Sequence, residues 1–92
     1  MTNLKTIRAF VNKEEGHSLH IISENNKLFS YTTCIAQWYD DKIIINCTKY
    51  SFTSSKHKTM LLTEIPRYIE LIELNDIPKD EDDLEKYIFK II

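Results

Sequence analysis

Hydrophobic and polar positions alternate most clearly on either side of Asp40 and Asp41, and this stretch predicts a β-hairpin. Leu28 to Tyr39 is rich in aromatic and β-branched residues, and Ile43 to Thr48 consists almost entirely of strand-forming residues. If the two aspartates form a two-residue loop, the numbers of paired residues sum to 81, and one face is wholly apolar. The pairs on this face are Cys34 with Cys47, Ala36 with Ile45, and Trp38 with Ile43.

The opposite face of the hairpin is mixed in character and can meet water or a partner. Its pairs are Ile35 with Asn46, Gln37 with Ile44, and Tyr39 with Lys42. A slip by one residue would exchange the two faces, so the pattern itself selects this register. A type I′ turn prefers Asn-Gly or Asp-Gly to Asp-Asp, and a longer loop is therefore the alternative.

Two further strands are predicted upstream of the hairpin. Ile7, Ala9 and Val11 alternate with polar or aromatic neighbours, which favours a strand. The only glycine closes a polar segment that suits a hairpin loop. The predicted elements are a strand at Lys5–Val11, a turn at Asn12–Gly16, a strand at His17–Ser23 and a turn at Glu24–Lys27.

Downstream of the hairpin, hydroxyl residues predict the start of a helix. Thr53, Ser54 or Ser55 would serve as its N-cap, and the helix would run on through Met60, Leu61 and Leu62. The next stretch, Ile65 to Leu74, has helical spacing but also alternates as a strand does. Pro66 requires a new element to begin near it, and we favour a fifth strand.

The last segment is expected to be a helix. Asn75 to Lys79 forms a loop, and Asp80 to Ile92 begins with an acidic first turn, which suits a helix N-terminus. Leu84, Tyr87, Ile88 and Ile91 then follow at helical spacing. The pattern predicts an α+β fold: a four- or five-stranded antiparallel meander, one helix after the central hairpin, and a C-terminal helix packed on one face of the sheet. The apolar end of this C-terminal helix could instead form part of a dimer or partner interface, and the pattern does not distinguish a monomer from a dimer.

Length and composition bound the class of protein. We expect the 92 residues to form one domain, and 42% apolar residues with one glycine and two prolines favour ordered structure. No apolar run approaches the roughly 20 residues of a membrane span, and the early charges do not suit a signal peptide. We therefore expect a cytoplasmic protein without membrane contact.

The residues that usually carry chemistry are few. His17 and His20 would point to opposite faces of a strand, so no metal site is expected. Cys34 and Cys47 fit no metal spacing, and we expect them to be free thiols, whether or not they touch across the hairpin. With a single glycine there is no phosphate-binding loop. We expect no cofactor and no catalytic activity.

The segment from Lys49 to Lys58 joins aromatic, hydroxyl and basic residues. Aromatic rings between lysines can stack on bases while the lysines contact phosphates. The simpler interpretation is that the hydroxyls cap a helix and the lysines are solvated. The residues of this candidate nucleic-acid surface are Lys49, Tyr50, Phe52, Ser54, Ser55, Lys56, His57 and Lys58.

The same region carries a resemblance. Ser30, Tyr31, Thr33, Ile35 and Ala36, followed later by Tyr50, Ser51, Thr53, Ser55, Lys56 and His57, resemble two motifs of an uncharacterised family of short proteins encoded by bacteriophages and prophages. Ser54 stands where the family pattern has a second threonine. The resemblance covers roughly a third of the chain; it implies an origin in a mobile element in a bacterial host cell and assigns no catalytic residue.

Charge is distributed unevenly along the chain. Residues 1–58 carry a net +3 and residues 59–92 a net −5. An acidic surface can mimic phosphate charge against a nucleic-acid-handling protein, although the same acids can simply complement a helix dipole. The hypothesis is a non-enzymatic inhibitor of a host protein, such as a defence nuclease of the CRISPR type, with a nucleic-acid-binding module as the alternative. Its partner-binding residues would be Glu70, Glu73, Asp80, Glu81, Asp82 and Asp83, with Gln37, Trp38 and Tyr39 as anchors.

Overall fold

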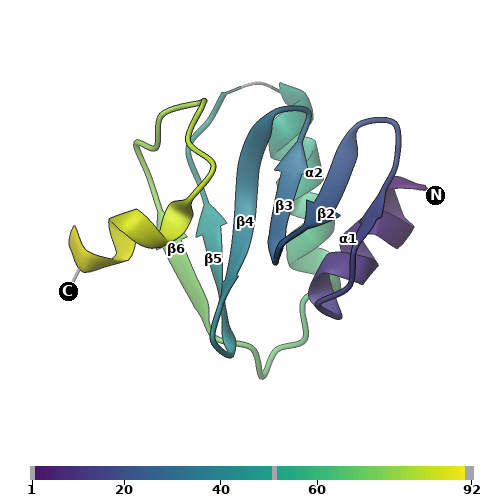
Figure 1. Cartoon of the computed structure of the whole chain (residues 1–92), viewed down its shortest axis with the longest axis horizontal. Helices are drawn as coiled ribbons and strands as arrows, with labels where there is room; N and C mark the ends of the chain where they lie inside the picture. The colour runs from purple at the N-terminus through teal and green to yellow at the C-terminus, as the bar shows by residue number, and fades with distance from the viewer. Residues whose placement is uncertain (1, 51, 91–92) are drawn as a thin grey trace.

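The structure is a computed structural model that describes the backbone of residues 2–50 and 52–90 and the side chains of residues 2–50 and 55–88. One six-stranded sheet lies between helices on both of its faces, which confirms the α+β class (Figure 1). In chain order the elements are α1 (Asn3–Val11), β1 (Gly16–His17), β2 (Ile21–Glu24), β3 (Lys27–Ser30), β4 (Thr33–Tyr39), β5 (Lys42–Asn46), α2 (Phe52–Glu64), β6 (Leu71–Leu74) and the 3₁₀ helix η1 (Leu84–Lys90).

The sheet is mixed, and the prediction of a purely antiparallel meander of four or five strands is wrong. Strands β1 to β5 form an antiparallel meander whose spatial order follows the chain. Helix α2 then carries the chain back along the sheet, so β6 joins β5 in parallel. The strand predicted within Ile65–Leu74 exists only over its last four residues.

The register predicted for the central hairpin is confirmed. Ala36 pairs with Ile45 and Trp38 with Ile43, across a two-residue turn. Asp40 occupies this turn with a φ of 54°. Aspartate tolerates the left-handed region better than most residues, which explains how an Asp-Asp loop closes the hairpin without glycine.

A β-bulge at Ile35 overturns the predicted cysteine pair. Leu28 pairs with Ala36 while Phe29 pairs with Cys34, so Ile35 is an extra residue in β4. Cys34 is thereby moved to the opposite face of the sheet from Cys47, and the two free thiols belong to different hydrophobic clusters. The regular pairing of β4 with β5 ends at Ala36 and Ile45.

Two predicted strands are each interrupted by a turn. The long strand Leu28–Tyr39 is divided into β3 and β4 at Tyr31 and Thr32, and Tyr31 has a φ of 57°. The strand His17–Ser23 is likewise divided into β1 and β2. Tyr31 and Thr32 have no strong turn preference, so strand propensity alone did not reveal the first turn. At the second turn the Ser18 hydroxyl accepts a hydrogen bond from the Ile21 amide at 3.2 Å, and this serine was the available signal.

The first element is a helix, so the predicted strand Lys5–Val11 is wrong. The Thr2 hydroxyl accepts a hydrogen bond from the Lys5 amide at 3.2 Å and caps the N-terminus of α1. Ile7, Phe10 and Val11 recur at helical spacing and all pack into the core. In such a short run the apolar residues fit both the helical period and the alternation of a strand. The capping residue Thr2 was the signal that could have distinguished a helix from a strand.

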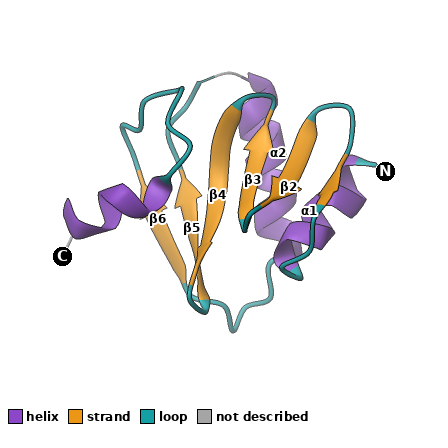
Figure 2. Ribbon diagram, viewed as in Figure 1, coloured by secondary structure: helices purple, strands orange, loops and turns teal. Residues whose placement is uncertain are grey.

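The core has two parts, one on each face of the sheet. Figure 2 shows α1 and α2 on one face and the C-terminal helix on the other. The first cluster joins the sheet to α1 and α2, with Ile7, Phe10 and Leu61 facing Ile43 and other strand residues. The second cluster joins the other face to the C-terminal segment through Ile77, Leu84 and Ile88. The predicted C-terminal helix therefore packs on one face as expected, although it is a 3₁₀ helix that begins at Leu84 rather than Asp80. Its predicted last residues, Ile91 and Ile92, lie outside the described chain.

Gln37 holds the C-terminal segment on the sheet. Its side chain is buried in β4, and its Oε1 accepts a hydrogen bond from the Leu84 amide at 2.7 Å. Its Nε2 donates to Asp83 Oδ1 at 3.2 Å. One amide side chain thus satisfies the first backbone N–H of η1 and the carboxylate that precedes it.

Replacing Gln37 by alanine is expected to destabilise the fold by about 1–3 kcal/mol, because the buried Leu84 amide loses its acceptor. The free energy of unfolding can be measured by urea denaturation followed by circular dichroism. The exposed Glu24 on β2 supplies the control, since Glu24→Ala should change this energy by less than about 0.5 kcal/mol. Equal effects of the two substitutions would contradict the role given to Gln37.

Candidate functional site

The six acidic residues predicted to bind a partner differ in how far they are available. Glu70, Glu73, Asp80 and Asp82 have exposed side chains. Glu81 is only 14% exposed; it accepts hydrogen bonds from the Tyr87 hydroxyl at 2.9 Å and from Lys86 Nζ at 3.2 Å. The Tyr87 hydrogen bond is the main reason that the pKa of Glu81 lies below its usual range. Asp83 is likewise engaged with the Gln37 amide, so four carboxylates remain for a partner.

Glu70 directly precedes β6, Glu73 lies within it, and Asp80 and Asp82 belong to the segment between β6 and η1. Figure 1 shows β6 at one end of the sheet. Successive residues of a strand point to opposite faces of the sheet. Glu73 therefore shares with Leu71 the face that α1 and α2 cover. Glu70 is on the other side and pairs with Lys42 Nζ at 3.5 Å. Glu70 and Glu73 therefore border the edge of the sheet from opposite faces instead of forming a patch on one.

The three predicted anchors are largely used inside the fold. Gln37 binds η1, as described above. The ring of Trp38 packs in the first cluster, its Nε1–H donates to the Phe10 carbonyl at 2.7 Å, and Lys13 Nζ lies 4.6 Å from the ring centre. Tyr39 is half-buried against the second cluster. Each of these side chains joins the sheet to a covering layer.

An exposed aromatic residue that the sequence analysis did not single out lies beside the acidic residues. Tyr68 is 85% exposed, in the turn just before β6 where the Ile69 amide donates to the Pro66 carbonyl. Tyr68 lies within the stretch Ile65 to Leu74, for which the sequence pattern predicted a helix or a strand. The signal that could have separated it was Pro66, which favours a turn at this point. We call Tyr68, Glu70, Glu73, Asp80 and Asp82 the acidic edge.

Several side chains of the candidate nucleic-acid segment, those of Tyr50, His57 and Lys58, form hydrogen bonds within the protein. Tyr50 donates its hydroxyl to the Ile77 carbonyl and accepts from the Asn46 side chain. Lys58 is buried, and its Nζ donates to the Thr48 carbonyl at 2.9 Å; this burial lowers the pKa of the lysine. Lys49 and Lys56 are exposed and Ser55 is half-buried, whereas the side chains of Phe52 and Ser54 are outside the description. Helix α2 begins at Phe52, before the predicted caps Thr53 to Ser55.

The two halves of the phage-like motif meet in space. Ser30 ends β3 and His57 lies in α2, and Ser30 Oγ is 2.6 Å from His57 Nδ1. The ring of Tyr31 lies 6.3 Å from that of His57 and 5.0 Å from that of His20, between centroids. We call His20, Ser30, Tyr31 and His57 the histidine cluster. Sequence reasoning missed it because Ser30 and His57 are far apart in the chain, and only the packing of α2 joins them.

The chemistry of the histidine cluster is limited by its burial. Ser30 is fully buried and His57 is 3% exposed, so a substrate does not reach the Ser30 hydroxyl in this conformation. Burial, followed by the nearby His20 and Lys56, lowers the pKa of His57. The serine and histidine therefore form an internal hydrogen bond that ties α2 to the turn containing Tyr31.

The thiols are not activated either. Burial raises the pKa of Cys34 to about 12, and burial together with Glu73 raises that of Cys47. A thiol needs a lowered pKa to act as a nucleophile near neutral pH. Neither cysteine has the surroundings that such a role requires.

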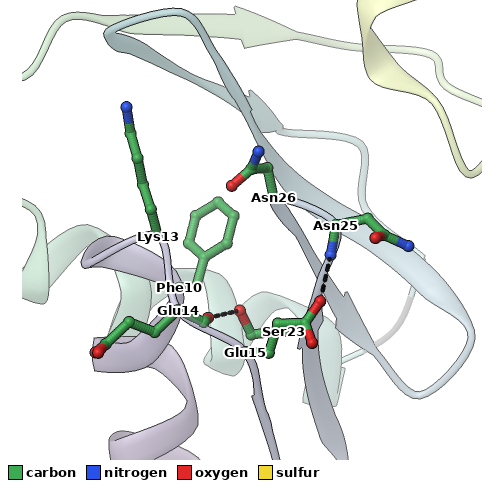
Figure 3. A pocket seen from close by; sticks show the side chains of 7 residues that line it. All are labelled: Phe10, Lys13, Glu14, Glu15, Ser23, Asn25 and Asn26. Carbon is green, nitrogen blue, oxygen red and sulfur yellow. Dashed lines mark hydrogen bonds between the residues drawn. The ribbon is translucent and has the colours of Figure 1, made fainter.

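A small polar recess lies between the end of α1 and the turn that joins β2 to β3 (Figure 3). Its volume is about 170 Å³. Ser23 Oγ donates to the Glu14 carbonyl at 2.8 Å, and the Asn25 amide donates to Glu15 Oε2 at 3.4 Å. These contacts join the two segments that form the recess. The residues that line it are Phe10, Lys13, Glu14, Glu15, Ser23, Asn25 and Asn26.

Among the side chains that the structure describes, no three His, Cys, Asp or Glu residues are grouped as a metal ion would require. Within residues 2–50 and 52–90, no helix has the length and apolar character needed to cross a membrane.

Because His57 is buried, we expect the stability of the protein to depend on pH. In the unfolded chain a histidine takes up its proton near pH 6.5, whereas folded His57 resists protonation. The unfolded state therefore binds more protons, and the stabilisation is complete above pH 6.5 and is lost as the pH falls below it. Between pH 7 and pH 5 the free energy of unfolding should fall more steeply for the wild type than for His57→Gln, by about 1.4 kcal/mol per unit of pKa depression.

Urea denaturation at several pH values measures this difference. The exposed His17 supplies the matched control, and His17→Gln should retain the wild-type slope. Parallel slopes for wild type and His57→Gln would contradict the assignment of the pH dependence to the histidine cluster.

No family model, curated protein or solved structure matches this chain. The resemblance to short phage and prophage proteins therefore stays a prediction from the two sequence motifs. What the structure adds is that residues of both motifs, Ser30 with Tyr31 and His57, lie against one another. The function has to be argued from the exposed surface.

Proposed function

We propose that this protein is a non-enzymatic binding protein, of phage or other mobile-element origin, that inhibits a host protein through its acidic edge. The observation that carries the proposal is the exposure of four carboxylates and one tyrosine between the turn before β6 and the start of η1. The target class that fits this surface is a nucleic-acid-handling enzyme of the bacterial host, such as a defence nuclease of the CRISPR type.

Electrostatics supports this choice of partner. Residues 59–92 carry a net charge of −5, and Glu70, Glu73, Asp80 and Asp82 are exposed members of this set. Enzymes that handle nucleic acids present basic surfaces to phosphates, and an acidic protein surface competes for the same groups. Complementary charge also raises the rate of association, by steering the two surfaces toward each other.

Tyr68 supplies the apolar contact that charge alone lacks. Tyrosine is enriched among the residues that dominate the binding energy of interfaces, because a large rigid ring is buried at low entropic cost. The side chain is 85% exposed and lies two residues from Glu70. An anchor surrounded by carboxylates would suit a basic groove with an apolar floor.

The alternative, a nucleic-acid-binding module, has less support. Internal hydrogen bonds engage the polar groups of Tyr50, His57 and Lys58. Among the described side chains of the segment, the exposed positive charges are those of Lys49 and Lys56. Two lysines are few for the phosphate contacts that give nucleic-acid binding its strength.

Reversing the charge of the acidic edge should abolish association with the host partner. The tagged protein is incubated with bacterial lysate, with and without nuclease, and bound proteins are identified by mass spectrometry. A stoichiometric host protein should survive nuclease with the wild type and be lost with Glu70→Lys combined with Glu73→Lys, because the attraction becomes repulsion.

The control reverses two exposed acids away from the acidic edge, Glu14→Lys with Glu24→Lys, and changes the net charge by the same amount. This variant should retain the partner. Equal retention by both variants, or recovery only of nucleic acid and of proteins that disappear after nuclease treatment, would refute the proposal. Circular dichroism of each variant verifies that it is folded.

A further inference from the structure

The outer edge of β6 carries backbone groups for which the described part of the chain provides no hydrogen-bond partner. Strand β6 is the last in the sheet formed by the described residues. The carbonyls of Glu70 and Leu74 accept hydrogen bonds from Ile43 and Cys47, so these residues direct their backbone toward β5. Because the direction alternates along a strand of a parallel pair, Leu71 and Glu73 direct both N–H and C=O away from the sheet. The edge therefore offers donors and acceptors for one more strand.

The charges beside this edge determine which strand it can accept. Glu70 and Glu73 border it on opposite faces, as their alternation along the strand requires. A second copy of this chain paired through β6 would bring its own glutamates next to these, and like charges in neighbouring strands are destabilising. A strand with lysine or arginine would instead place opposite charges at the same positions.

The C-terminal segment offers cover for an added strand. Figure 1 shows η1, in yellow, crossing in front of β6 and reaching past it on the open side of the sheet. Ile88 of this helix is buried against the second cluster, which fixes the helix to the sheet. A strand added at the edge would lie beside this overhang and would have one face partly shielded from water.

We propose that β6 binds an extended basic segment of the partner protein as a seventh strand of the sheet. The inference rests on the proposed function and specifies how the acidic edge holds its partner. Main-chain hydrogen bonds to Leu71 and Glu73 provide the attachment, and basic side chains of the partner that pair with Glu70 and Glu73 provide specificity. Strand addition to an exposed edge needs no deep pocket, which fits the shape of this molecule.

The test uses a ten-residue peptide of lysine and threonine, with lysines on both faces of the extended strand so that Glu70 and Glu73 can each meet one. It is titrated into the isotope-labelled full chain and followed by NMR. The expected result is slower hydrogen exchange at the amides of Leu71 and Glu73. A matched peptide that is N-methylated at every residue keeps the charge but has no N–H group on either edge, so it cannot donate hydrogen bonds to the outward carbonyls of β6. Equal binding of the two peptides, or unchanged exchange at both amides with saturating peptide, would overturn the proposal.

Two substitutions at one position separate backbone pairing from charge. Glu73→Pro removes the outward N–H, which an edge strand tolerates, and also the carboxylate. Glu73→Gln removes only the charge. We expect Glu73→Gln to weaken peptide binding a few-fold and Glu73→Pro to weaken it at least ten-fold; equal affinities would overturn strand addition. If the proline variant does not fold, the exchange rates of the wild type decide alone.

Hydrogen exchange in a complex with the captured host protein distinguishes this inference from the proposed function. If binding depends on the carboxylates but Leu71 and Glu73 exchange as in the free protein, strand addition is wrong and the acidic-edge function stands. If both amides are protected only by the peptide and no host protein is captured, the edge accepts a basic strand and the proposed function fails.

Discussion

The structure depends on burying the two central strands on both of their faces. Residues 33–38 of β4 and 43–46 of β5 are all buried, and the bulge at Ile35 sends consecutive apolar side chains of β4 to the same side. Such a sheet cannot leave either face in water, so α1 and α2 cover one face and the C-terminal segment covers the other. The acidic edge follows from this arrangement, since the segment after β6 must cross back over the sheet.

The sequence pattern predicted those features of the fold that depend on residues close together in the chain. The register of the central hairpin followed from alternation, because a one-residue slip would expose its apolar face. Helix α1 was missed because its short apolar run satisfies two periods, and the parallel pairing of β6 depends on the path of α2. The bulge at Ile35 leaves no mark in the composition, and it was enough to separate Cys34 from Cys47.

The candidate site was harder to predict for a related reason. A polar or aromatic residue is available to a partner only if no other part of the protein packs over it. The segments that pack over a residue are often far from it in the sequence. Gln37 and Trp38 are engaged by the C-terminal segment and by α1, while Tyr68, placed by a turn, stays exposed. The exposed carboxylates were predictable as a group from charge, but the internal bonding of Glu81 and Asp83 was not.

The surroundings of Trp38 give the protein a built-in optical probe. It is the only tryptophan in the chain, and it contacts the Phe10 carbonyl and the Lys13 ammonium group at the end of α1. Its fluorescence therefore reports the docking of the N-terminal helix, and release of that helix would expose the indole and shift its emission to longer wavelength. Movement of η1 occurs on the opposite face, among tyrosines and aliphatic residues. The tryptophan emission would thus report loosening of the N-terminal helix separately from loosening of the C-terminal layer.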